Sequence, residues 1–412
     1  MLTATATTTA QADELIHELV LGKDGKRDPY PYYRRLRELA PVHRSELDRN
    51  YYLSGYWATR DLLLHRAVGR SENGRMLRYG INPEQLKRFR EQGFVNMLTV
   101  NPPDHGRLRK PARGPFLPGR MEGRLAERVI EIVDERLDVV AEMGEADLMK
   151  EVAFQLPVTV IGEMVGVPPE DRDEFPELVN EFFRAGQMNA TKEDLDRGDR
   201  ARLRFREYFA GLIERNRRDS GPDLVGALVA DGTLNDEELQ GTITLIFVAG
   251  FITTANLVGN GMLAMFRQPE QLELLWRDPE VVPNAVEEML RYDSSVQLVE
   301  RFALEDIEVG DHLIEKGSGI LCLLGAANHD PDHFADADRL HLDRANANTH
   351  IGFAWGIHHC LGAPLARLEA VTLFARMRER FTRVEPLELD PPRNPSLGIR
   401  ALKSLPMRFV PA

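Results

Sequence analysis

The chain has 412 residues and a formal net charge of −13, from 65 acidic and 52 basic side chains. Nucleic-acid binding relies on an excess of basic side chains that neutralise phosphates, so this charge gives no support for a nucleic-acid partner. Two cysteines in a chain of this length indicate a reducing compartment and exclude a disulfide-stabilised secreted scaffold.

The N-terminal residues 1–10 are rich in threonine and alanine and lack the basic start and apolar segment of a secretion signal. The strongest apolar run, 243–255, contains glycine and threonine and is shorter than the roughly 20 apolar residues that span a bilayer. We therefore expect a soluble, cytoplasmic protein without a membrane partner. No linker or repeat divides the chain, so we expect a flexible N-terminal segment over 1–27 and a single domain over 28–412.

Apolar side chains recur every three or four residues through most of the chain, which predicts a mainly α fold. Helices are expected over 32–39, 57–66, 104–116, 125–142, 151–165, 169–185, 191–217, 223–231, 235–266, 282–292 and 361–381. Strand-like alternation is confined to 42–53 and 296–322, so the β region is the smaller one. The segments 67–100 and 330–349 show no continuous period and are expected to be largely irregular.

The longest expected helix, 235–266, would span about 45 Å and must cross the middle of the domain. Its centre is apolar on all sides, which is typical of a core helix. Ala249 and Gly250 are two small residues in succession that weaken the helix and open a notch. Thr253 lies one turn later, and its hydroxyl can bond a backbone carbonyl or a guest molecule in that notch.

Cys360 lies in the loop 353–362, with the sequence FAWGIHHCLG, directly before the expected helix 361–381. Amides in the first turn of that helix point back at the sulfur, and a helix N-terminus favours an anionic thiolate. A lone thiolate flanked by glycines suits a haem iron, whereas a plain core cysteine needs neither the glycines nor the neighbouring histidine. Cys322 lies in an apolar strand pattern and is expected to be a core residue, so too few thiolates remain for a zinc or iron–sulfur site.

The cysteine loop resembles that of the cytochrome P450 family, the haem-thiolate monooxygenases, whose usual pattern is Phe-Gly-x-Gly-x-His-x-Cys-x-Gly. Ala354 stands where the first glycine is usual, and the other positions match in register: Phe353, Gly356, His358, Cys360 and Gly362. The resemblance extends from residue 28 to the C-terminus, with further motifs in the family's order. It implies the cytochrome P450 fold, with haem b between the long central helix and the cysteine loop, Cys360 as the iron ligand, and Phe353 and Gly362 beside the cofactor.

The notch in the central helix is similar to the family's oxygen-binding motif, Ala/Gly-Gly-x-acid-Thr, which Ala249, Gly250 and Thr253 match. Ile252 occupies the place of the usual acid, and isoleucine cannot relay a proton. In this motif the threonine helps deliver protons to bound O2, so the resemblance implies that role for Thr253. Either a water held by Asn256, four residues further along the helix, or a polar group of the substrate is expected to replace the acid.

Glu288 and Arg291 are spaced as an ordinary helical surface ion pair, and they also match the family's Glu-x-x-Arg motif. The resemblance implies that this pair is buried and that Arg339 completes a Glu–Arg–Arg cluster with a structural role.

His105 and Arg109 lie four residues apart at a helix start and, taken alone, are a solvated pair. In the family, a similar His-x-x-x-Arg binds a haem propionate, and Arg301 and His358 fall at further propionate-binding positions. Four such donors around two carboxylates make charge-assisted hydrogen bonds, which are the strong ones.

The resemblance implies an enzyme that activates O2 to hydroxylate or epoxidise a medium or large organic substrate in natural-product biosynthesis. Electrons come from a separate reductase through a ferredoxin-type carrier, because the chain contains no flavin or nicotinamide motif. An atypical haem-thiolate enzyme for oxidative coupling, ring closure or peroxide-driven oxidation and a haem gas sensor are the alternatives. By family analogy, the substrate pocket is lined from 67–100 and 169–217 and by five single residues: Leu245, Val248, Gln297, Leu397 and Ile399.

A short basic cluster comprises Arg107, Arg109, Lys110 and Arg113. It is expected to be either a solvated helix face or a docking patch for an acidic protein.

Overall fold

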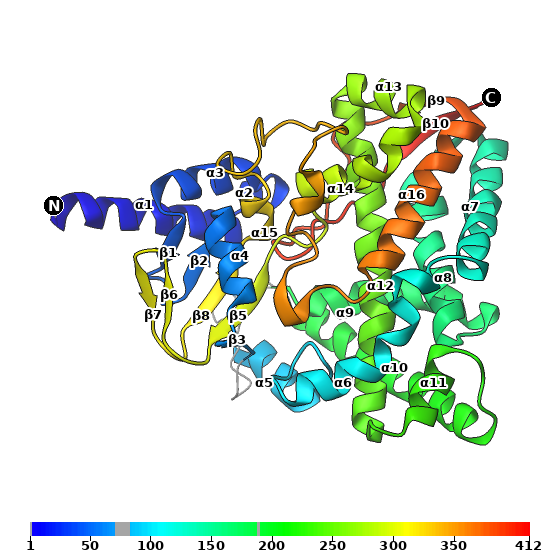
Figure 1. Cartoon of the computed structure of the whole chain (residues 1–412), viewed down its shortest axis with the longest axis horizontal. Coiled ribbons are helices and arrows are strands. Elements are labelled where there is room, and N and C mark those ends of the chain that lie inside the picture. The colour runs from blue at the N-terminus through cyan, green and yellow to red at the C-terminus, as the bar shows by residue number, and fades with distance from the viewer. Residues whose placement is uncertain (1, 71–82, 188–189) are drawn as a thin grey trace.

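The computed structural model describes residues 2–70, 83–187 and 190–412. Most helices gather on one side of the molecule, and the strands of the larger sheet lie on the other side, beside the N-terminal helices (Figure 1). The C-terminal strands β9 and β10 lie among the helices. This arrangement confirms the expectation of a mainly α fold with a smaller β region.

The α-helices are α1 (Leu2–Val20), α2 (Lys23–Arg27), α3 (Tyr30–Leu39), α4 (Tyr56–Leu64), α5 (Pro83–Gln92), α6 (Asp104–Ala112), α7 (Arg124–Met143), α8 (Gln155–Val165), α9 (Phe175–Ala185), α10 (Lys192–Arg218), α11 (Leu224–Asp231), α12 (Asp236–Arg267), α13 (Pro269–Arg277), α14 (Val282–Tyr292), α15 (Leu324–Ala327) and α16 (Ala363–Arg380). The strands are β1 (Val42–Arg44), β2 (Tyr51–Leu53), β3 (Val68–Gly69), β4 (Glu145–Asp147), β5 (Val299–Ala303), β6 (Ile307–Val309), β7 (His312–Ile314), β8 (Gly319–Cys322), β9 (Phe381–Pro386) and β10 (Pro406–Pro411).

Helix α12 runs through the middle of the helical side, as its length and composition predict (Figure 1). Its start is fixed by a capping box, in which the Asn235 side chain accepts from the Glu238 amide and the Glu238 carboxylate accepts from the Asn235 amide, both at 3.0 Å. The helix is long and apolar enough to cross a membrane, but 78% of its most apolar window is buried inside the protein. It is therefore the core helix of the fold.

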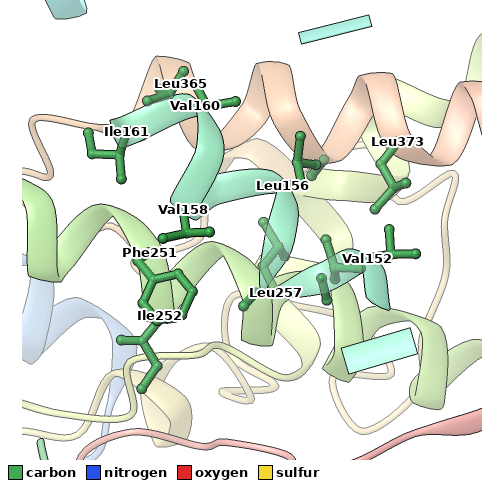
Figure 2. Close-up of a cluster of buried hydrophobic side chains, with 14 of the residues drawn as sticks. Val152, Leu156, Val158, Val160, Ile161, Phe251, Ile252, Leu257, Leu365 and Leu373 are labelled. Carbon is green, nitrogen blue, oxygen red and sulfur yellow. The ribbon is translucent and has the colours of Figure 1, made fainter. Parts of the chain in front are cut away.

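Side chains from α8, α12 and α16 meet in one apolar cluster around the centre of α12 (Figure 2). Leu156 and Ile161 on α8, Phe251 on α12 and Leu373 on α16 are almost completely buried there. Burial of a side chain of this size contributes about 1.5–3 kcal/mol, so the cluster holds α12 firmly against its neighbours.

The larger sheet has the strand order β1-β2-β8-β5-β3 and lies beside the helical body. Strand β2 pairs parallel to β8, and the other neighbouring strands pair antiparallel. The short β3 pairs with β5 in a register that sets Val68 opposite Ala303 and Gly69 opposite Phe302. Buried Cys322 lies on β8 as a core residue, and burial raises the pKa of its thiol to about 12.

The N-terminal segment differs from the expectation of flexibility over 1–27, because α1 and α2 occupy it. Ile16 and Leu19 of α1 are buried in an apolar cluster with Tyr33 and Leu36 of α3. Five further elements were not predicted: α13, α15, β4 and the C-terminal strands β9 and β10. The helix expected over 169–185 begins as a 3₁₀ turn, Pro169–Glu174, and only then continues as α9. Within 67–100, residues 71–82 lie outside the described residues, and the rest contains α5.

A buried ion cluster on α14 fixes the irregular segment that precedes the cysteine loop. The carboxylate of Glu288 accepts from Arg291 at 2.7 and 2.9 Å and from Nε of Arg344 at 3.0 and 3.1 Å. Both side chains of the Glu288–Arg291 pair are fully buried. The prediction that Arg339 completes this cluster is wrong: its side chain is 66% exposed and pairs with Glu270. Arg344 takes that place, while Arg339 contributes only its carbonyl oxygen.

Candidate functional site

The loop that carries Cys360 is closed by a hydrogen bond from the Cys360 amide to the Phe353 carbonyl at 3.0 Å. Gly356 has a φ of 76°, and a Cβ there would lie 2.1 Å from the Leu63 carbonyl oxygen, so only glycine fits. Ala354 has a φ of 55°, a left-handed conformation that costs an L-residue about 1–2 kcal/mol. This explains why a glycine is usual at that position.

The sulfur of Cys360 lies at the start of α16 and is half-buried. Burial raises the pKa of the thiol, and backbone amides of Gly362 and Ala363 together with the guanidinium groups of Arg109 and Arg367 oppose this rise. Helix-start amides therefore do point at the sulfur, as the sequence predicts. No Cβ contact would arise at Gly362, which leaves this side of the loop open to a flat group.

One face in the middle of α12 is exposed, between residues that are buried. Ala249 is exposed, and Leu245, Gly250 and Thr253 are partly exposed. Residues four apart share a helix face, so Leu245, Ala249 and Thr253 lie along this one face. The Thr253 hydroxyl donates to the Ala249 carbonyl at 2.8 Å, and Ser295 donates to the Thr253 carbonyl at 2.7 Å.

Two histidines and two arginines that the motifs single out lie close together. The rings of His105 and His358 are 4.5 Å apart, and the Nε2 atom of each is buried without a hydrogen-bond partner. Burial lowers the pKa of His105. The pKa of His358 is lowered to about 2, mainly by burial and to a smaller extent by the charges of nearby arginines. Arg301 is 3% exposed, and burial lowers its pKa as well. Arg109 turns inward and donates to the His359 carbonyl at 2.6 Å.

Arg70, at the end of β3, belongs to the same cationic group, and no motif predicted it. Its charge contributes to the lowered pKa of both His105 and His358. Its own Nε is buried without a partner. No sequence motif shows this, because Arg70 is separated from the other members by at least 35 residues. It reaches them through the pairing of β3 with β5 and through hydrogen bonds between its backbone and the Asn101 side chain, just before α6.

The family model for cytochrome P450 matches residues 277–406 of the chain. The polyketide biosynthesis cytochrome P450 PksS of Bacillus subtilis is 34% identical over 94% of this chain and 97% of its own length. The chain belongs to the cytochrome P450 family. Monooxygenase PikC of Streptomyces venezuelae, another cytochrome P450, is 38% identical over 94% of this chain and 93% of its own.

Solved P450 structures share the fold over nearly the whole chain. The structure of PksS matches with a TM-score of 0.83 at 33% identity, covering 94% of this chain and 98% of that one. P450BioI, solved in complex with an acyl carrier protein that carries hexadec-9Z-enoic acid, matches with a TM-score of 0.85 at 31% identity, covering 94% and 99%. These matches show that the chain has the cytochrome P450 fold and that it is a monooxygenase that uses haem b and O2.

The residues of this P450 fit a haem with its two propionates. The cationic group consists of buried donors, some without a partner, and it needs an anion to complete it. Cys360 offers a sulfur on a loop with an open face, and the exposed face of α12 supplies space for a flat cofactor. When bound, haem supplies redox chemistry and the activation of O2.

Asn256 does not have the role that the sequence suggests. It is completely buried, donates to the Ile252 carbonyl at 2.7 Å and accepts from the Leu402 amide at 3.0 Å. Its amide nitrogen therefore bonds within α12 and its amide oxygen joins α12 to the C-terminal segment, and the buried side chain does not face the pocket. The role of Gly250 also differs from the prediction of a notch for a guest molecule. A Cβ at this position would lie 3.3 Å from Ile161, so the glycine mainly allows α8 to pack closely on α12.

Two of the expected substrate contacts are corrected by the structure. The Gln297 amide donates to the Ser294 carbonyl at 2.7 Å and to the Tyr30 hydroxyl at 3.2 Å, so this residue joins β-region loops to α3. Leu397 packs in the apolar cluster beneath α1. Val248 is 4% exposed, and Ile399 is partly exposed and bridges to Val296.

A depression of about 450 Å³ lies on the outer side of the cysteine loop. It is lined by residues of α6, the following turn, the loop and the start of α16: Gly106, Arg109, Lys110, Arg113, Phe116, Leu117, Pro118, Gly356, Ile357, His359, Cys360, Leu361, Ala363, Pro364 and Arg367. Arg107 is not among them, because it pairs with Glu238 and Asp104.

Proposed function

We propose that this P450 holds haem b through Cys360 and oxidises a medium or large organic substrate of natural-product biosynthesis by hydroxylation or epoxidation. The observation that carries the proposal is the exposed face of Leu245, Ala249 and Thr253 in the middle of the core helix, where the neighbouring residues are buried. An exposed apolar face in the core lowers the stability that burial would supply. We therefore infer that this face lines a binding site for the cofactor and the substrate. His105, Arg109, Arg301 and His358 bind the propionates, with Phe353 and Gly362 beside the ring.

The names of the relatives support the substrate class, since PksS acts in polyketide biosynthesis and P450BioI was solved with a long fatty acyl group on a carrier protein. Leu245, Val248 and Ile399 are the side chains that we assign to the substrate. The test is a screen of polyketide lactones and long-chain fatty acids for a Soret shift, followed by turnover with NADPH, reductase and ferredoxin. A product heavier by one oxygen atom supports the proposal, and a product lighter by two hydrogen atoms points to coupling or ring closure.

Oxidative coupling, ring closure or peroxide-driven oxidation is the second candidate, and Ile252 is the observation that favours it. Ile252 is 3% exposed and apolar where the family usually places an acid, and Asn256 is committed to backbone contacts. Proton delivery therefore depends on Thr253 or on the substrate itself. A haem gas sensor is the third reading, and substrate-dependent consumption of NADPH with a new product excludes it.

Thr253→Ala is expected to divert electrons from product into hydrogen peroxide. The reason is that Thr253 carries the side-chain hydroxyl on the exposed face of α12, beside the apolar Leu245 and Ala249. We expect product per NADPH to fall several-fold. The change in this yield is smaller than the roughly 10²–10⁴-fold that a positioned proton donor contributes to the rate of its own step. The measurement is product and peroxide released per NADPH.

Thr254→Ala is the matched control, because Thr254 makes the same bond to a carbonyl one turn back, at 3.3 Å, but is buried. Ile252→Asp is expected to leave coupling unchanged or lower, since it adds a charge to a dry site. Full coupling in Thr253→Ala would make the substrate the proton donor.

We further propose that a ferredoxin-type protein, reduced by a separate reductase, docks on the depression outside the cysteine loop. Lys110 and Arg113 are exposed on its rim, and the described residues offer no acidic partner within ion-pair distance of either. Leu117 and Ile357 expose apolar surface beside them, at 42% and 47%. A basic rim around an apolar centre within an acidic protein suits a small acidic partner. This role requires no membrane, and we propose that the protein acts in the cytoplasm. Residues 28–412 form the proposed single functional domain together with α1, which packs on α3.

The double variant Lys110→Glu and Arg113→Glu is expected to slow reduction by ferredoxin about tenfold or more, since charged patches raise association rates by 10–10³. Affinity for substrate stays unchanged because both side chains lie outside the haem pocket. Stopped-flow reduction at low and high salt measures the effect. Arg107→Glu cannot replace these changes, because Arg107 pairs with Glu238. An exposed control that has no ion pair among the described residues is Lys316→Glu, in the turn between β7 and β8. Reduction rates insensitive to salt and to the double variant would place the docking face elsewhere.

A further inference from the structure

Arg70 and Arg301 lie side by side at one edge of the larger sheet. The register that pairs Val68 with Ala303 and Gly69 with Phe302 sets Arg70 next to Arg301. Both guanidinium groups donate through Nη1 to the same acceptor, the Glu300 carbonyl oxygen, at 2.9 and 2.8 Å. Two like charges are thus held together by the backbone.

This pair lacks a carboxylate counter-charge within ion-pair distance among the residues that the structure describes. Burial and then the charge of Arg301 lower the pKa of Arg70 to about 9, and the Glu300 carboxylate offsets only part of this effect. Buried like charges are destabilising unless an anion lies between them. The arrangement is therefore built around a ligand that brings negative charge.

The free donors show what kind of anion fits. Nε of Arg70 and the Nε2 atoms of His105 and His358 are buried without a partner, and the two histidine rings lie 4.5 Å apart. The Asn101 side chain accepts from the Arg70 amide at 2.6 Å and donates to the Arg70 carbonyl at 2.9 Å, and the Asn101 carbonyl accepts from the His105 amide at 2.9 Å, so Arg70 is joined directly to the start of α6. A carboxylate has two oxygens with about four acceptor positions, and guanidinium donors match it in a planar, two-point contact.

We propose that Arg70 and Arg301 together bind one carboxylate, and that this carboxylate is a haem propionate. Arg70 is then a fifth propionate-binding residue, alongside the four that the family motifs imply. A substrate carboxylate has the same chemistry, but the propionate is favoured because His105 and His358 share the cluster and His358 lies two residues before Cys360. The inference rests on haem binding through Cys360.

The test measures haem transfer from purified holoenzyme to excess apomyoglobin for the wild type, Arg70→Gln and Arg70→Lys. We expect Arg70→Gln to speed haem loss about tenfold or more, as the loss of a hydrogen bond between charged groups predicts. Arg70→Lys keeps the charge but not the planar fork, so its rate should lie between the two. Arg37→Gln is the matched control, because Arg37 is also a largely buried arginine that donates to a backbone carbonyl, at 2.9 Å, but on α3.

Reconstitution with haem dimethyl ester separates the two sources of the carboxylate. If Arg70 binds a propionate, wild type and Arg70→Gln should lose the esterified haem at equal rates. If Arg70→Gln loses ordinary haem at the wild-type rate but binds palmitic acid more weakly, while binding its methyl ester as before, the carboxylate is the substrate's and the propionate assignment is overturned. No change in either measurement overturns the carboxylate site altogether. Failure of haem binding through Cys360 is seen separately, as a wild type without a thiolate-type spectrum.

Discussion

Cys360→His is expected to abolish the long-wavelength Soret band of the reduced carbonyl complex and to reduce monooxygenase activity to background. The thiolate pushes electron density onto the iron and favours O–O cleavage, and imidazole lacks this electron-donating strength. The loop around Cys360 is shaped for sulfur by the Cys360 amide bond to Phe353 and by the amides of Gly362 and Ala363. The measurements are the spectrum of the reduced carbonyl complex and product formation with NADPH.

Cys322→Ala is the control for this experiment, because Cys322 is fully buried on β8. It should keep the wild-type spectrum and lose only the stability that follows from a small cavity. A long-wavelength band that persists in Cys360→His, or a wild type with a histidine-like spectrum, would contradict Cys360 as the iron ligand.

The parts of the site that the sequence predicts are those written in short, contiguous motifs. Cys360, its glycines and the start of α16 lie within one run of residues, so local rules for loops and helix starts were sufficient to identify them. Helix α12 was predicted closely, over 235–266 against Asp236–Arg267, because its capping box and long apolar pattern are also local signals.

The parts that the sequence did not predict depend on contacts between distant segments. Arg70 joins the cationic group through the pairing of β3 with β5 and through the Asn101 side chain, which bonds its backbone. Gln297 and Leu397 were expected to line the pocket, but their orientations are set by contacts with Ser294, Tyr30 and the cluster under α1. The packing of α1 was missed for the same reason, since a segment rich in threonine and alanine shows little apolar periodicity until its partner α3 is known.

Glu288→Ala is expected to have the largest effect on stability of any single change proposed for this chain. Its carboxylate is fully buried and balances the charges of two buried arginines, Arg291 and Arg344. Removal of one partner from a buried ion cluster leaves uncompensated charge and costs about 3–5 kcal/mol. That is a large part of the total stability of a typical domain, about 5–15 kcal/mol, so we expect little soluble holoenzyme. The measurements are the yield of haem-loaded protein and the midpoint of urea unfolding.

Arg344→Ala and Arg339→Ala distinguish the cluster seen in the structure from the one that the motif suggested. Arg344 donates to both Glu288 oxygens, so its removal should approach the effect of Glu288→Ala. The exposed Arg339 side chain lies 3.6 Å from Glu270, and its removal should change stability by no more than about 0.5 kcal/mol. The opposite ranking of the two arginine variants would mean that Arg339 balances Glu288. Because the cluster anchors the segment that leads into the cysteine loop, Arg344→Ala should also lower haem occupancy in the protein that remains folded, whereas Arg339→Ala should not.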